Sequence, residues 1–325
     1  MEGPPAGVSA FLYDAEGEDR ELTLDAVDLA GLDERELLWL DVSDVEQLEL
    51  ATDALGLAAG TGAGLAHAPA RADLGFHTDY VHISVVVTKR ATHGYEATPL
   101  HCLVGENWIT TVHEAPVEFL ERFSEQIRGD SGLGELDAPG LAAVFLHEHI
   151  ASYLREVEPL ELELERIDLQ SMTGRGHDEA VLRQLVSVRR RLAQLRRLFA
   201  PHRELYARLA LPDFALLSES VSPEAYTSLS ERSEQALQRL ETTREMILNS
   251  FDIYTTWTAH ETNRVMRLLT VASVALLPPT LLASVMGMNS LPHVLSSSQA
   301  FDVTLGGMLL IAATVLGSAR YRGWL

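Results

Sequence analysis

Hydroxyl side chains recur along one face of an uncharged segment near the C-terminal end. Thr270, Ser273, Thr280 and Ser284 are separated by three, seven and four residues, with Leu277 in the vacant place. A 3.5-residue period keeps such a set on one face of a supercoiled helix. Copies of this face could line a water-filled ion path, or the hydroxyls could only bond to neighbouring helices and their own backbone. Spacing alone leaves both interpretations open.

This polar face extends beyond the hydroxyl residues in both directions. Towards the N-terminus it passes through Met266, Asn263 and Asp252, and its C-terminal end is followed directly by Gly287-Met288-Asn289. The face is polar on a helix that is otherwise apolar, so it is the candidate for the chemistry of the chain.

The hydroxyl face lies on the first of two uncharged segments near the C-terminal end. Residues 268–286 and 303–319 contain no charged side chain. About 20 apolar residues span a bilayer, so the first run is close to spanning length and the second is at the short end of the range. Both contain Gly, Ser, Thr and Ala, which allow close helix contact in lipid. We predict two transmembrane helices; a pair of buried core helices is the soluble alternative.

Basic residues flank the two runs asymmetrically. Arg264 and Arg267 precede the first run, Arg320 and Arg322 follow the second, and residues 287–302 contain no Lys or Arg. The positive-inside rule then predicts that both termini are cytoplasmic and that the short loop is external. The expected location is the inner (plasma) membrane, with 320–325 as a cytoplasmic tail.

The N-terminal half is strongly acidic. Residues 1–150 carry 28 acidic against 7 basic side chains, which accounts for −21 of the formal charge of −22. Such a surface disfavours nucleic acid and attracts cations. The single cysteine, Cys102, excludes an intramolecular disulfide and fits a reducing compartment.

Residues 1–140 are predicted to form a cytoplasmic α/β domain, followed by cytoplasmic helices over 141–221. Runs rich in β-branched residues predict strands, and apolar periodicity predicts helices. The expected strands are 37–41, 80–89, 98–104 and 108–112, the last two as a hairpin; the expected helices are 45–55, 117–127, 141–171 and 178–211, with a loop over 129–140.

A long stalk helix over 222–267 is expected to continue into the first span. Ser222 and Pro223 have the form of a helix start, and neither Gly nor Pro follows until Pro278. Up to residue 286 this helix would be on the order of 95 Å long. Near-heptad apolar positions indicate a coiled seam, namely Leu237, Leu240, Ile247, Phe251 and Tyr254. Such a helix needs partners along both halves, so we expect a homo-oligomer.

The sequence resembles the CorA family of magnesium transporters. The likeness runs through Asn263-Arg-Val-Met-Arg-Leu-Leu-Thr270, Leu277-Pro278, Gly287-Met-Asn289 and the closing Tyr321-Arg-Gly-Trp-Leu325. It is strong across 220–325, extends to the arginine-rich segment ending at Arg203, and covers 1–140 only in general layout. A bare Gly-Met-Asn is common, but its place after the first of two C-terminal spans is specific.

The resemblance implies a funnel-shaped homopentamer that conducts divalent cations. The first span lines the pore, the second packs outside it, and Gly287, Met288 and Asn289 form the external selectivity filter. Asp252 matches a pore-entry aspartate, and Met266 and Leu269 match a narrow apolar gate. The full set of expected pore-lining residues is Asp252, Asn263, Met266, Leu269, Thr270, Ser273, Leu277, Thr280 and Ser284.

Magnesium suits these residues. Mg²⁺ loses its waters reluctantly. Asn289 amide oxygens and Gly287 carbonyls can accept hydrogen bonds from those waters, and a neutral ring lets the ion leave again. Metal contacts are therefore expected at Asn289 and Gly287 through ion-bound waters, and at Asp252. The membrane potential would drive transport without ATP, so no enzymatic activity is expected.

The sequence departs from the family in the external loop and at one position of the stalk. The external loop lacks a carboxylate before Asp302, and His293 is its one good metal-binding side chain. The stalk position where relatives use a carboxylate to sense cytoplasmic Mg²⁺ falls on Ser228, with Glu231 one turn on. Regulation by Mg²⁺ is therefore expected to be weak or to use other acids. His147 and His149 point apart on a helix, so they are not expected to share a metal.

Three alternatives are open. The first is a zinc carrier of the related ZntB branch, which usually has another residue in place of Met288. The second is a non-conducting, membrane-anchored structural or sensing protein. The third, a soluble metal-dependent enzyme, is disfavoured by the two spans. Co²⁺ and Ni²⁺ are further candidate ions beside Mg²⁺.

Overall fold

The computed structural model describes residues 7–15, 19–33, 35–58, 60–92, 94–126, 137–172, 179–211, 223–287 and 298–324. The chain divides into two units. The first comprises 1–167 and 182–249, and the second comprises 168–181 and 250–325. Each unit is described by itself.

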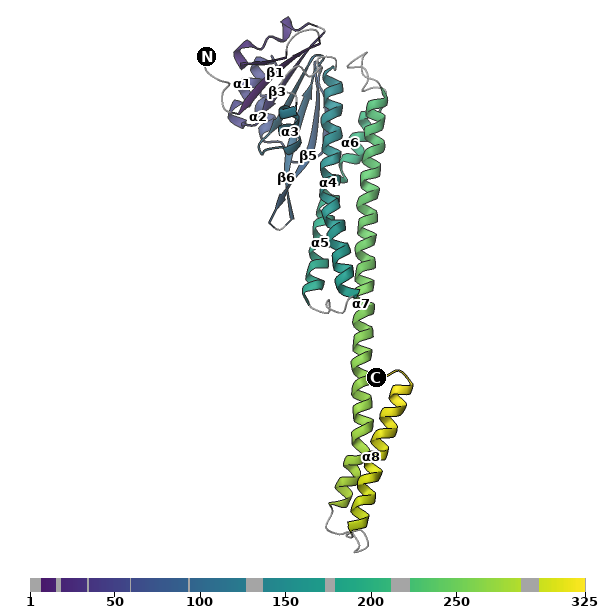
Figure 1. Cartoon of the computed structure of the whole chain (residues 1–325). Helices are drawn as coiled ribbons and strands as arrows, with labels where there is room; N and C mark the ends of the chain where they lie inside the picture. The colour runs from purple at the N-terminus through teal and green to yellow at the C-terminus, as the bar shows by residue number, and fades with distance from the viewer. Residues whose placement is uncertain are drawn as a thin grey trace. The chain divides into compact units, whose positions relative to one another are not determined.

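The first unit is built on a seven-stranded sheet with the order β2-β1-β3-β7-β6-β5-β4 (Figure 1). Strands β3 and β7 pair in parallel and all other neighbours are antiparallel. The strands are β1 (Val8–Asp14), β2 (Arg20–Leu22), β3 (Glu36–Val42), β4 (Asp73–Phe76), β5 (Val81–Ala91), β6 (Gly94–Val104) and β7 (Trp108–His113). The predicted strands and the hairpin between β6 and β7 are confirmed, whereas β1, β2 and β4 were missed.

Helices cover both faces of this sheet. On one face Leu38 and Leu40 of β3 share a buried cluster with Leu48 and Ala51 of α1 (Leu48–Ala54). On the other face Trp39 packs against α3 and α4, 5.7 Å from the Phe123 ring and 5.2 Å from that of Phe145. The alternation along β3 therefore creates a three-layer α/β/α arrangement, as the period-2 pattern of a buried strand requires.

Four of the remaining described helices have more than about 20 residues, namely α4, α5, α7 and α8. They are η1 (Leu24–Ala26), η2 (Leu29–Gly31), η3 (Val45–Gln47), α2 (Thr61–Ala66), α3 (Glu118–Gln126), α4 (Ala138–Met172), α5 (Glu179–Phe199), α6 (His202–Leu209), α7 (Pro223–Met286) and α8 (Ser298–Tyr321). The predicted continuous helix over 178–211 is wrong, because it ends at Phe199 and restarts after Pro201, whose ring nitrogen has no hydrogen to donate. The predicted loop over 129–140 is wrong for 138–140, which begin α4; the residues before 137 lie outside the described part.

One face of α7 forms a regular seam within the first unit. Its buried residues alternate at spacings of three and four and are each no more than 3% exposed: Tyr226, Leu229, Ser233, Ala236, Leu240, Thr243 and Ile247. The Tyr226 hydroxyl donates to Pro139 O of α4 at 2.7 Å, and the Thr243 hydroxyl donates to Glu161 at 2.7 Å. Arg239 pairs with the same Glu161 at 2.7 Å. We call this set the stalk seam.

The stalk seam corrects one expectation. Leu240 and Ile247 belong to it, whereas Leu237, Phe251 and Tyr254 are only half-buried. The partner of this seam is α4 of the same chain, so the water-exposed half of α7 does not by itself require an oligomer. An ion pair between Arg191 of α5 and Glu163 of α4 joins the arginine-rich helix to the acidic helix before it.

Two buried histidines bind the edge of β5 at residues that lie beyond its pairing with β4. His149 Nε2 lies 2.9 Å from Val86 O, and Val86 N–H donates to His202 Nε2 at 2.9 Å. The Tyr153 hydroxyl donates to Val86 O as well, at 2.8 Å. His149 is therefore a structural residue rather than a metal ligand. Its neighbour His147 is only partly buried and takes no part in this contact.

Acid is expected to destabilise this unit through its neutral histidines. Burial lowers the pKa of His202 to about 4 and that of His149 well below its usual value. Burial also lowers the pKa values of His82 and His101, which contact each other at 3.0 Å, to about 4. The unfolded chain then binds more protons below pH 6.5. The free energy of unfolding should therefore keep its full value above pH 6.5. Below that pH it should fall towards pH 4 by roughly 1.4 kcal/mol per pH unit for each histidine.

Urea unfolding of the purified full-length protein at pH 7.5 and 5.0, followed by tryptophan fluorescence, measures this effect. His202→Gln keeps an acceptor for Val86 N–H but removes one titrating group. We expect it to lower stability at pH 7.5 and to reduce the loss between the two pH values. An equal pH dependence in both proteins would contradict the assignment.

Candidate ion-conduction face

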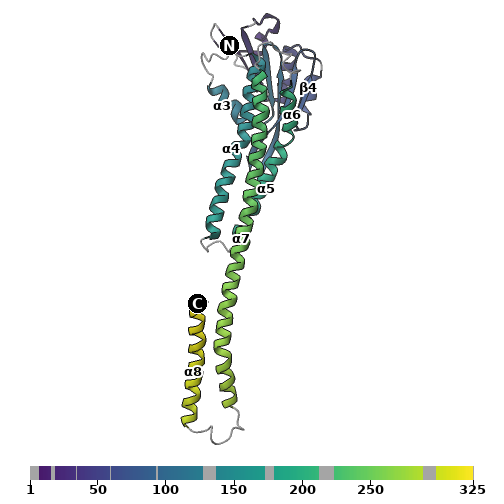
Figure 2. The same ribbon diagram turned by 90° about the vertical axis from the view of Figure 1, so that its right-hand side faces the viewer.

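In the second unit, α7 and α8 form an antiparallel pair (Figures 1 and 2). Val271 and Ala275 of α7 and Ala319 of α8 are buried, each at most 7% exposed. Val271 and Ala275 lie 28 residues, or four heptads, after Thr243 and Ile247 of the stalk seam. The buried positions of α7 in the two units are thus spaced by whole heptads, which on a straight helix corresponds to a drift of about 80°, at about 20° per heptad.

Apart from Thr270, the predicted hydroxyl face lies away from this packed side. Ser273 and Leu277 follow Val271 and Ala275 by two residues, which is about 200° around a helix. Met266 and Leu277 are 60% and 66% exposed. The other members of the predicted face are also exposed, namely Asp252, Asn263, Leu269, Thr270, Ser273, Thr280 and Ser284. Thr270 additionally borders a groove between α7 and α8.

The hydroxyl hydrogens of this face are used within α7. The hydroxyl of Thr270 donates to Met266 O at 2.8 Å, that of Ser273 to Leu269 O at 2.8 Å, and that of Thr280 to Leu276 O at 2.7 Å. Each oxygen keeps lone pairs that can accept hydrogen bonds. Water bound to a cation presents its hydrogens outwards, so such oxygens are suited to a hydrated cation.

The predicted filter lies mainly outside the described residues. Gly287 is described, and its N–H donates to Ala283 O at 3.0 Å at the end of α7. Met288 and Asn289 of the filter, and His293 of the following loop, are not among the described residues. Among those that are described, no group of three or more His, Cys, Asp or Glu side chains could hold a metal ion.

Both C-terminal helices expose apolar surface of membrane-spanning length. The spanning window within Glu224–Val285 has a mean hydropathy of 1.9 and is 11% buried; that within Asp302–Tyr321 has 1.6 and is 6% buried. A core helix of a soluble protein would be mostly buried, so this surface requires lipid or further protein. Exposed residues include Leu276, Leu281, Leu309 and Leu310.

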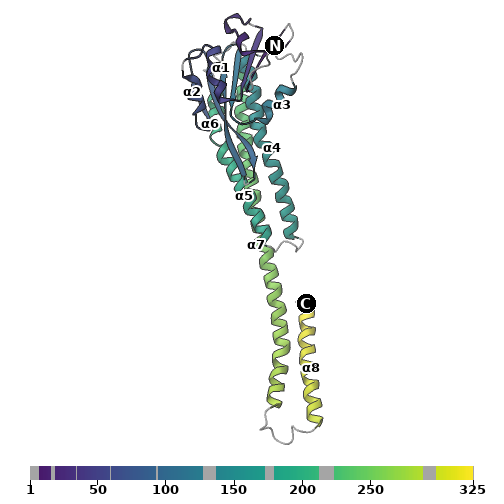
Figure 3. The same cartoon turned by 90° about the vertical axis from the view of Figure 1, so that its left-hand side faces the viewer.

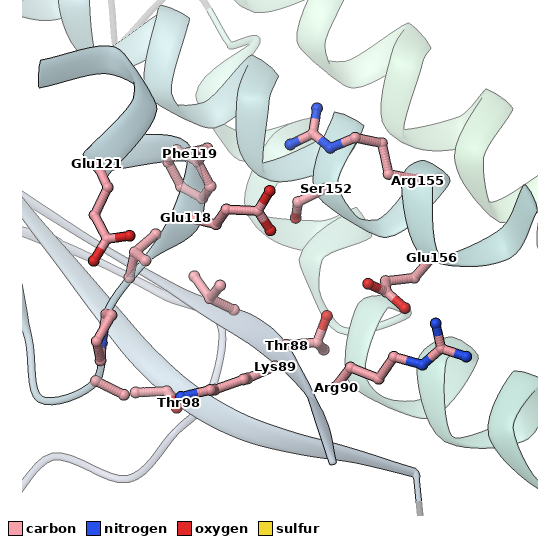
Figure 4. Close-up of a pocket in the computed structure, with 14 residues that line it drawn as sticks. Thr88, Lys89, Arg90, Thr98, Glu118, Phe119, Glu121, Ser152, Arg155 and Glu156 are labelled. Carbon is pink, nitrogen blue, oxygen red and sulfur yellow. The ribbon is translucent and has the colours of Figure 1, made fainter. Parts of the chain in front are cut away.

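A cavity of about 470 Å³ in the α/β layer brings acidic and basic side chains together (Figure 4). Lys89 and Arg90 of β5 and Arg155 of α4 line it, as do three carboxylates, those of Glu118, Glu121 and Glu156. Arg155 pairs with Glu148 at 3.2 Å, and Tyr95 hydrogen-bonds to Glu156. The opposite charges balance in number, so this cavity lacks the excess of carboxylates expected for a divalent-cation sensor.

The stalk position that corresponds to the family's sensing carboxylate lies on α7. The Ser228 hydroxyl donates to Ala225 O at 2.7 Å, and Glu231 is exposed on α7. Sequence reasoning missed the pair of His113 and Asp41, whose Nε2 and Oδ1 atoms are 3.2 Å apart. Burial alone would lower the pKa of His113, but its bond to Asp41 outweighs burial and raises it. Only the parallel pairing of β3 with β7 brings these residues together.

Comparison with known proteins identifies relatives over most of the chain. The family described as "CorA-like Mg2+ transporter protein" matches residues 34–317. The cobalt/magnesium transport protein CorA of Thermotoga maritima is 23% identical over 255 residues, which cover 77% of this chain and 72% of that protein.

Solved structures share the fold. The complete CorA magnesium transporter of Methanocaldococcus jannaschii superposes with a TM-score of 0.76 at 20% identity, covering 97% of this chain and 98% of that one. The full-length CmaX protein gives 0.75 at 19% identity, covering 98% and 100%. The ZntB cytoplasmic domain of Vibrio parahaemolyticus gives 0.61 at 11% identity, covering 78% and 99%. The match over residues 34–317 shows that the chain belongs to the family of CorA-like Mg²⁺ transporter proteins.

Proposed function

We propose that this chain transports divalent cations passively across the inner (plasma) membrane, with Mg²⁺ as its main ion and Co²⁺ or Ni²⁺ as further ones. Five copies would surround a pore lined by α7, with α8 outside. One observation carries the proposal: the hydroxyl face of α7 lies about 200° away from the side that packs on α8. A face left uncovered by its own chain is free to line a shared axis.

The ion would keep its waters along this route. The ring of Gly287, Met288 and Asn289 receives it at the external mouth, and the acceptor oxygens of Ser273, Thr280 and Ser284 follow. Met266 and Leu269 form the apolar gate, and Asp252 attracts the ion at the cytoplasmic end. Both termini are placed in the cytoplasm, in line with the arginines that flank the two spans.

The membrane potential suffices to drive uptake. Moving two charges through 100 mV releases about 4.6 kcal/mol, at about 2.3 kcal/mol per charge. Cytoplasmic Mg²⁺ would regulate the pore only weakly, since Ser228 occupies the stalk position at which the resemblance implies a sensing carboxylate.

Flux into liposomes tests the proposal. We expect the purified protein to admit Mg²⁺ to an internal indicator, faster at an inside-negative potential of about −100 mV than after the potential is collapsed. Uptake of Zn²⁺ but not Mg²⁺ would support the ZntB alternative, whose cytoplasmic domain shares this fold. No divalent flux at matched incorporation would contradict conduction and support a structural or sensing protein.

A further inference from the structure

A groove of about 310 Å³ runs between α7 and α8 at the end where α8 finishes. Figure 3 shows the two helices of this unit side by side. Its lining includes Val271, Val274, Thr314, Ala319, Arg322 and Trp324, and Thr270 borders it. We call it the α7–α8 groove.

The walls of the groove are apolar. Val271 and Ala319 are each 5% exposed where the helices meet, whereas Val274 is 49% exposed beside them. The Thr314 hydroxyl donates to Leu310 O at 2.7 Å, and the Thr270 hydroxyl donates to Met266 O. The walls therefore offer dispersion contacts and few hydrogen-bond donors, which suits a hydrocarbon chain.

A helix cap fixes the polar end of the groove. Gly323 has a φ of +68°, its N–H donates to Arg320 O at 3.1 Å, and Trp324 N–H donates to Ala319 O at 2.9 Å. These two bonds form a Schellman motif, which turns the chain back over the last turn of α8. The turn places the Arg322 guanidinium 6.0 Å from the centre of the Trp324 ring. The Arg322 guanidinium and the Trp324 indole thus lie next to each other at one end of an apolar groove.

We propose that the α7–α8 groove binds an anionic phospholipid, with an acyl chain along the valine walls and its phosphate group on Arg322. Three features specify this ligand. The walls match hydrocarbon, the guanidinium matches a phosphate, and tryptophan is the residue that favours the membrane interface. The other candidate occupant is a second copy of the chain, which would offer Arg322 few carboxylates. The described spanning residues of α7 and α8 beyond Glu261 contain one acid, Asp302, at the opposite end of α8.

This inference rests on the membrane location in the proposed function but not on conduction. Its test is native mass spectrometry of the full-length protein released from bilayers of phosphatidylglycerol and phosphatidylcholine. We expect retained phosphatidylglycerol to fall at least about fivefold in Arg322→Ala, because this variant loses both a charge near an anionic surface and the charge-assisted hydrogen bonds to the phosphate. Arg264→Ala removes an equal charge that does not line the groove, so it reports the effect of surface charge alone and should retain clearly more phosphatidylglycerol than Arg322→Ala.

A second measurement separates the acyl chain from the headgroup. Lipids brominated along the acyl chain should quench part of the tryptophan fluorescence, and Trp324→Phe should remove that part. Equal lipid retention by Arg322→Ala and Arg264→Ala would overturn the proposal, and so would quenching that is unchanged in Trp324→Phe. Loss of oligomer mass in Arg322→Ala with unchanged lipid retention would assign the groove to a second copy of the chain. Mg²⁺ flux measured on the same variants reports separately on the proposed function.

Discussion

Asn289→Ala is expected to abolish growth rescue of a bacterial strain that lacks its own Mg²⁺ transporters. In the proposed pentamer this single change removes five amide oxygens from the external ring. A hydrogen bond to one of them is worth about 1 kcal/mol net. Losing the ring as a whole should therefore reduce Mg²⁺ flux at least about tenfold, because the loop before Asp302 has no carboxylate that could replace it. Growth in low Mg²⁺ and radiometric or indicator-based uptake both measure the change.

The matched controls vary the same loop. Ser296→Ala removes a polar group from the same loop outside the motif and should rescue growth normally. Asn289→Gln keeps the amide but displaces it by one methylene, so it should retain part of the flux. All variants are compared at equal membrane expression. Full rescue by Asn289→Ala would show that the filter is assigned to the wrong residues.

Cysteines placed along α7 should distinguish the pore face from lipid. We expect a cationic, membrane-impermeant methanethiosulfonate to reduce Mg²⁺ flux at least about tenfold in each of three variants, Ser273→Cys, Thr280→Cys and Ser284→Cys. The reagent needs a thiolate, which forms in water but not in hydrocarbon. A bulky cation fixed inside the pore then blocks and repels the ion. Flux before and after treatment gives the result for each variant.

The native chain supplies the background for this experiment. Cys102 is 1% exposed, and burial raises the pKa of its thiol to about 12, so the unmodified protein should be inert to the reagent. Leu309→Cys and Leu310→Cys, on the exposed side of α8, serve as lipid-facing controls and should keep their flux. The pore assignment would be contradicted if the reagent modified the two α8 cysteines but left the Mg²⁺ flux of the three α7 variants unchanged.

Local patterns predicted the elements that are long or strongly periodic. The continuous α7 followed from the absence of Gly and Pro before Pro278, and β3 and β5 followed from their β-branched and apolar runs. Short edge strands were missed, because β2 has three residues and β4 four, too few to show a period. The break at Pro201 was recognisable from the proline itself, whose ring opposes a continuous helix.

Contacts between distant segments were beyond sequence reasoning. The histidine contacts of Val86 join β5 to α4 and α6 over 63 and 116 residues. Spacing could show that His147 and His149 diverge on a helix, but not that the second of them binds a strand edge. Of the predicted coiled seam, only Leu240 and Ile247 belong to the stalk seam, and an amphipathic face does not by itself specify which surface covers it. The hydroxyl face was placed correctly along α7, and its role as a pore stays a prediction.

The seven-residue repeat also sets a rule for how the length of α7 can change. The packed positions of the stalk seam and those beside α8 stand four heptads apart on one continuous helix. Inserting seven residues between them would shift the two sets by about 10 Å along the axis and leave their directions almost unchanged. Inserting one residue would turn the hydroxyl face by about 100° relative to the seam. Changes of length by whole heptads are therefore the ones that preserve the direction of both sets of positions.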